Sequence, residues 1–105
     1  MPRLTTPKLT IIYWRDIPAQ VIGQQGRKRH KQRLPQRFAV AIDRAAMRAG
    51  KGSSKAYLEE WRRDSRPCKG ELEPAVNAEV DRLDALFPDD VLELAVKAGG
   101  IVNKE

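Results

Sequence analysis

The strongest constraint on the fold is a strand-like segment near the start of the chain, followed by helical periodicity over the remainder. Residues 9–14 form a run of β-branched and aromatic residues with apolar side chains on both faces, which is typical of a strand. Turn-forming residues follow, and residues 19–22 resume a β-like pattern, so we expect a hairpin. A further edge strand is expected over residues 31–34.

Four helices are expected after this β region. Pro35 suits the first turn of a helix, and apolar residues then recur at helical spacing until Gly50. The expected helices lie near residues 36–49, 54–63, 74–86 and 89–98. Strands followed by helices indicate an α+β fold, in which a small antiparallel β-hairpin or three-stranded sheet packs against about four helices on one of its faces.

The chain of 105 residues has room for one hydrophobic core, which predicts a single domain over residues 1–105. Residues 1–7 and 101–105 are expected to be flexible tails. The longest apolar run is too short to span a membrane, and no signal peptide is recognisable. A lone cysteine, Cys68, cannot form an internal disulfide, which fits a reducing compartment. We therefore expect a cytoplasmic protein without membrane contacts.

Charge is distributed unevenly along the chain. The net charge is +10 over residues 1–52 and −4 over residues 53–105, and such a basic region attracts anionic partners. Residues 23–33 contain a dense basic run with nothing apolar to bury, so we interpret them as an exposed basic loop. Three further arginines share one face of the following helix. The candidate basic surface comprises Arg27, Lys28, Arg29, Lys31, Arg33, Arg37, Arg44 and Arg48.

No catalytic motif is recognisable in the sequence. His30 is the only histidine, so counting excludes a Ser-His-Asp triad and a histidine-rich metal site. No serine lies in a nucleophile elbow, and no phosphate-binding loop has the required spacing. We therefore expect no catalytic residues, no metal and no cofactor, and a non-enzymatic function.

Four segments carry a resemblance to a known family. Residues 11–21, 34–38, 41–50 and 57–61 resemble the bacterial "virulence factor" domain family, also found at the end of conserved virulence factor C, and the similarity covers most of residues 8–100. The resemblance implies an accessory module, because longer relatives attach this domain to helical repeats and an iron–sulfur scaffold-type domain. It supplies no catalytic residues. The chain also lacks the cysteines that an iron–sulfur cluster needs.

These observations predict a module that binds an acidic protein partner through the basic surface, with Trp14, Arg15 and Asp16 as a second contact turn. One alternative is a nucleic-acid-binding protein whose basic loop contacts phosphates without reading bases. A second alternative is a small subunit of a folate- or corrinoid-dependent one-carbon enzyme, because the resemblance implies a genomic neighbourhood of that kind. The sequence leaves the oligomeric state open.

Overall fold

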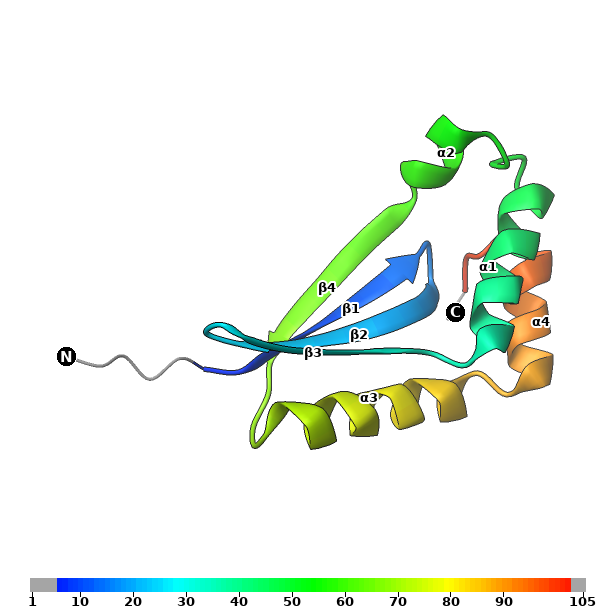
Figure 1. Ribbon diagram of the computed structural model, residues 1–105. Helices are drawn as coiled ribbons and strands as arrows, with labels where there is room; N and C mark the ends of the chain where they lie inside the picture. Colours follow the sequence, from blue (N-terminus) through cyan, green and yellow to red (C-terminus); the bar gives the residue numbers. More distant parts are fainter. Residues whose placement is uncertain (1–5, 103–105) are drawn as a thin grey trace.

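A computed structural model describes residues 6–102 and shows an α+β fold, in which a four-stranded antiparallel sheet is combined with four helices (Figure 1). The predicted α+β class is confirmed, but the sheet has four strands where a hairpin or three strands were expected. The strands are β1 (Lys8–Trp14), β2 (Ile17–Gln25), β3 (Lys28–Arg33) and β4 (Trp61–Pro67). The helices are α1 (Gln36–Arg48), α2 (Ser54–Leu58), α3 (Leu72–Leu86) and α4 (Asp89–Lys97).

The sheet has the strand order β3-β2-β1-β4. The first three strands form a meander, and β4 pairs antiparallel with the free edge of β1, so that Ile11 lies between Val21 and Asp64. The predicted hairpin over residues 9–22 is present. A bulge near Ile12 leaves Ala19 without a partner on β1, and the Ala19 carbonyl oxygen instead accepts a hydrogen bond from the Leu34 amide at 3.0 Å.

The prediction that residues 23–33 form an exposed loop is wrong, because most of them lie in strands. Residues 23–25 continue β2, residues 28–33 form β3, and only Gly26 and Arg27 make the turn between them. The expected short edge strand at residues 31–34 is therefore the end of a longer one. An exposed loop and a charged edge strand have similar sequences. An edge strand can carry polar side chains on both faces, because its backbone pairs with a neighbour on one side only.

The second expected helix, near residues 54–63, is shorter than predicted. Ser53 caps α2 by accepting a hydrogen bond from the Ala56 amide at 3.3 Å, but the helix ends at Leu58 and Trp61 begins β4. The strand β4 carries six consecutive exposed residues after Trp61 and has no apolar alternation of its own. This segment is a strand because its backbone pairs with that of β1, and its own residue pattern does not predict a strand.

The helices cover one face and one end of the sheet. Helix α3 runs beneath β2 and β3, while α1 and α4 pack against each other beside the end of the sheet where β1 turns into β2 (Figure 1). A side chain at Gly23 would place its Cβ atom 2.7 Å from Val76 Cγ2, which shows how closely α3 approaches β2. The core joins Trp14 and Ile17 of the sheet with Phe38 of α1.

The expected flexible tails lie mostly outside the described residues. Where residues 6–7 and 101–102 are described, they make contacts, because Pro7 accepts a hydrogen bond from Cys68 and the Val102 amide donates to Asp16 at 2.7 Å. Within the described part of the chain, the longest helices are too short and too polar to cross a membrane.

A buried carboxylate ties α3 to the edge strand β4. Glu79 is only 6% exposed and lies 2.6 Å from Arg66 Nη2 of β4, while Arg82 donates to it from the next turn of α3. Burial by itself would raise the pKa of Glu79, but the hydrogen bonds from Arg82 and Arg66 outweigh it and hold the pKa below its ordinary value of 4.5.

This arrangement predicts an acid-sensitive contribution to stability. A carboxyl group whose pKa is lowered by folding stabilises the protein fully above its ordinary pKa, and that stabilisation disappears as the pH falls through the lower folded value. Glu79→Gln should reduce the free energy of unfolding by about 1–3 kcal/mol at neutral pH, since both arginines remain half exposed and can return to water. Urea unfolding of both proteins from neutral pH to below pH 4.5 should show this difference shrinking. A difference that stays constant would contradict the role of the Glu79 ion pairs.

Candidate functional site

The two faces of the sheet have different surroundings. Gly23 faces α3, and because it pairs with His30, the alternation along β3 turns His30 and its i±2 neighbours toward α3. Arg29, Lys31 and Arg33 therefore point to the opposite side of the sheet, which only the α1 end of the fold reaches. We call this side the open face.

The open face carries a cluster of positive charges. Strand pairing aligns residues of the two edge strands, β3 and β4, across the open face. One cross-strand row runs from Arg33 through Ile12 to Arg63, and the next runs from Lys31 through Thr10 to Ser65. The strand residues that point to this side include no Asp or Glu within residues 6–102. Five exposed cations lie there without an ion pair in the described part of the chain, and we call them the cationic face: Lys8, Arg29, Lys31, Arg33 and Arg63.

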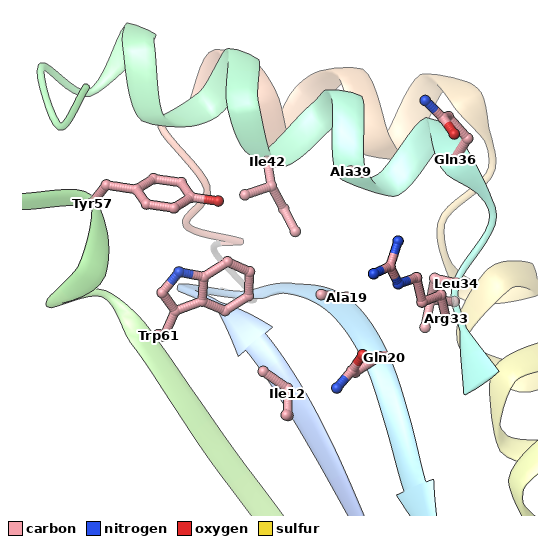
Figure 2. A pocket seen from close by; sticks show the side chains of 10 residues that line it. All are labelled: Ile12, Ala19, Gln20, Arg33, Leu34, Gln36, Ala39, Ile42, Tyr57 and Trp61. Atoms are coloured by element: carbon pink, nitrogen blue, oxygen red, sulfur yellow. The ribbon is translucent and has the colours of Figure 1, made fainter. Parts of the chain in front are cut away.

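A cavity of about 460 Å³ lies between α1 and the end of the open face (Figure 2). Ile12, Ala19 and Gln20 form its floor, and Ala39 and Ile42 of α1 form its roof. The rings of Tyr57 and Trp61 close one end, while Gln36, Leu34 and Arg33 lie at the other. The cavity is therefore lined mainly by apolar and aromatic side chains, with Gln20 as the polar residue of its floor, and it opens at Arg33 onto the cationic face.

The aromatic end of this cavity is held in place by neighbouring rings. Tyr57 stacks on the fully buried Trp14 with a centroid distance of 5.9 Å and meets Trp61 edge to face at 5.7 Å. Burial, with a smaller contribution from the carboxylate of Asp43, raises the pKa of Tyr57. Its hydroxyl group therefore stays protonated at neutral pH and remains a hydrogen-bond donor beside the cavity.

The helical arginines of the predicted basic surface lie elsewhere. Arg37 contacts Asp84 and Asp89, and Arg44 makes a two-pronged hydrogen bond to Glu93 at 2.8 and 2.9 Å. The hydrogen bond from Arg44 also lowers the pKa of Glu93. These two side chains join α1 to the start of α4 and the end of α3. Arg48, on the same helix face, is exposed near Glu93.

The turn formed by Trp14, Arg15 and Asp16 is occupied by internal contacts. Arg15 pairs with Glu60 at 3.2 Å and donates to the Gly99 carbonyl oxygen at 3.1 Å. Asp16 accepts hydrogen bonds from Arg62 and from the Val102 amide. The C-terminal segment and the start of β4 thus cover this turn. The side chains of Arg15 and Asp16 stabilise the fold through these internal contacts.

The remaining predicted cations lie at the tip of the β2–β3 hairpin. Arg27 is in the turn, and Lys28 is on the α3 side of β3, so the structure separates both from the cationic face. Sequence reasoning missed Lys8 and Arg63, which join that face only through the pairing of β1 with its neighbours. It also missed the cavity. The alternation of Arg29, Lys31 and Arg33 at every second residue is the signal that would have indicated a strand.

Residues 6–102 contain no group of three or more His, Cys, Asp or Glu side chains placed to hold a metal ion. Cys68, just beyond β4, is a half-buried free thiol.

The fold and this surface define a small α+β domain whose antiparallel sheet is covered by α3 on one face, while the other face is cationic and is covered only at its α1 end. The family model described as "Virulence factor" matches residues 12–96, so the chain belongs to the virulence factor family. The matched region includes the whole cavity and every member of the cationic face except Lys8. No curated protein and no solved structure matches the chain.

Proposed function

We propose that this domain is a non-enzymatic binding module that contacts an acidic protein partner through the cationic face. The observation that carries the proposal is the concentration of five cations, unpaired within the described residues, on a sheet face that a helix covers only at its α1 end. Uncompensated charges of one sign on a small surface steer a partner of the opposite sign and set its orientation.

The contrast with the other arginines supports this assignment. Arg37, Arg44 and Arg66 are engaged by Asp or Glu side chains of the same chain, so their charges are already neutralised locally. Arg29, Arg33 and Arg63 remain available, and the planar guanidinium group can bind a carboxylate with two parallel hydrogen bonds. The partner is therefore expected to present clustered Asp or Glu residues.

A protein partner is favoured over single-stranded nucleic acid by the residues in the middle of the open face. Proteins that bind single strands on a sheet stack bases on aromatic side chains of the central strands. Here the central positions between the cations are aliphatic or polar and none is aromatic: Thr10, Ile12, Gln20, Ile22 and Gln24. The rings of Tyr57 and Trp61 lie in the end cavity instead.

Charge reversal of β3 tests the proposal. Arg29→Glu combined with Lys31→Glu should weaken binding to the acidic partner at least tenfold, about 1.4 kcal/mol, because it replaces attraction by repulsion at the centre of the cationic face. The matched control is Lys55→Glu combined with Lys69→Glu, which changes the net charge equally at exposed positions outside the sheet face. Tagged wild-type and variant proteins would be used to capture partners from a lysate of the source cells, with and without nuclease, and the affinity for a captured protein would then be measured.

The expected result is a defined acidic protein that survives nuclease treatment, is retained by the control and is lost by the β3 variant. Equal capture by the β3 variant would show that the cationic face is not the binding surface. Capture that disappears with nuclease and with high salt would contradict a protein partner and favour polynucleotide binding. A folate- or corrinoid-binding protein among the specific partners would favour the one-carbon enzyme subunit.

A further inference from the structure

The cavity has room for an apolar side chain of a partner. Its volume of about 460 Å³ lies within the range of roughly 300–1,000 Å³ that is common for binding pockets. Its roof is apolar, its floor is apolar except for Gln20, and Trp61 is half buried with part of its ring facing the cavity. A partly exposed tryptophan beside an apolar cavity is the kind of residue that dominates binding energy at interfaces.

The cations next to the cavity are evenly spaced along one line. Arg33, Lys31 and Arg29 occupy alternate positions of β3, so successive charged groups leave the strand about 7 Å apart. Arg33 is both the first member of this line and a residue that lines the cavity. An extended peptide lying on the open face alongside β3 also presents every second side chain to the sheet, with the same repeat of about 7 Å.

We propose that the cavity is the anchor pocket for an extended acidic segment of the partner, in which one aromatic or branched apolar side chain enters between α1 and the sheet. Carboxylates at alternate positions beyond this anchor pair with Arg33, Lys31 and Arg29. The inference rests on the proposed acidic protein partner. It adds the sequence pattern that the partner segment must have, which is an apolar residue followed or preceded by acidic residues at every second position. Charge complementarity along β3 supplies affinity, and the cavity sets the register.

The probes that test this pattern are short peptides with blocked ends. One has the sequence Phe-Ser-Glu-Ser-Glu-Ser-Glu, a second has the reverse order, and a third has Gly in place of Phe. Titration calorimetry gives the affinities. None of the probes contains tryptophan, so a change in protein fluorescence reports on Trp61, which lines the cavity, or on Trp14, which stacks on Tyr57 at its aromatic end. At least one Phe peptide should bind ten times more tightly than the Gly peptide and change the fluorescence.

Filling the cavity provides the specific variant. Ala39→Phe places a ring at an exposed helix position that lines the cavity, so it should leave the core unchanged. It is expected to reduce the affinity of the Phe peptide to that of the Gly peptide without altering the latter. The matched control is Ala85→Phe at an exposed position of α3 that does not line the cavity, and thermal unfolding verifies that both variants fold.

The outcomes separate this inference from the proposed function. Equal affinities of the Phe and Gly peptides, both lost in the Arg29→Glu and Lys31→Glu variant, would overturn the anchor pocket and leave the acidic partner supported. Tight binding of the Phe peptide that Ala39→Phe does not weaken would also overturn the pocket. Competition of all three peptides by a polyuridine strand that itself binds far more tightly would overturn both proposals.

Discussion

An alanine in place of Trp14 is expected to lower the free energy of unfolding by about 3–5 kcal/mol, the range found when a large buried aromatic side chain is truncated. The Trp14 side chain is fully buried, and its Nε1–H donates to the Tyr57 carbonyl oxygen at 2.9 Å. Its ring also stacks on Tyr57. A domain of this size has a total stability of about 5–15 kcal/mol, so the variant should be close to unfolding. Urea denaturation followed by circular dichroism measures the loss.

Trp14→Phe is the matched control for this experiment. It keeps an aromatic ring against Tyr57 but removes the indole N–H, so it should lose about 1–2 kcal/mol, mostly from the unpaired carbonyl group and the smaller ring. Equal losses in both variants would show that the hydrogen bond to Tyr57, and not the packing of the indole, supplies the stability. Because Tyr57 closes the cavity, the alanine variant should also weaken binding there, whereas the phenylalanine variant should preserve it.

Gly100→Ala is expected to destabilise the protein by about 2–4 kcal/mol, with two separate causes. Gly100 has φ of +93°, which costs an alanine about 1–2 kcal/mol. A Cβ atom there would also lie 2.8 Å from Trp14 Cζ3, and forcing a side chain into a filled core costs about 1–3 kcal/mol. The Gly100 carbonyl oxygen accepts a hydrogen bond from the Asp16 amide, so a shift of this segment would disturb the β1–β2 turn as well.

Gly50→Ala separates the two causes. Gly50 has φ of +72°, but a Cβ atom there would meet nothing within 4 Å, so this variant should show the backbone cost alone. Thermal and urea unfolding of both variants would give the difference that belongs to the contact with Trp14. If Gly100→Ala lowers the free energy of unfolding no more than Gly50→Ala does, the C-terminal segment shifts to accommodate the added methyl group. In that case the segment does not hold Trp14 in place.

The helices and the first hairpin could be predicted because their signals are local. The apolar residues of α1 and α3 recur with the helical period, and Pro35 and Gly50 mark the boundaries of the first of these helices. The run over residues 9–14 has the composition of a strand regardless of its neighbours. These elements form wherever they find a complementary apolar surface, so the α+β class follows from the sequence.

The strand β4 and the first half of β3 could not be predicted in the same way. Both consist largely of charged and polar residues, and each is a strand because a neighbour, β2 or β1, offers its backbone hydrogen-bonding groups. Such pairing depends on residues far apart in sequence. Tyr57, Leu58 and Trp61 have helical spacing, yet only the first two lie in α2, because Trp61 pairs with Trp14 across the sheet.

The sequence by itself determined the α+β class, the limits of three of the four helices to within two residues, and the strongly basic character of the first half of the chain. Tertiary structure alone decided how those charges are used. Arg37 and Arg44 meet carboxylates of α3 and α4, while alternation along β3 and the arrival of β4 bring Arg29, Lys31, Arg33 and Arg63 to one face. The physical reason is that composition and periodicity depend on residues close together in the sequence. Whether two charged side chains pair depends on the distance between them, which is fixed only when the chain folds.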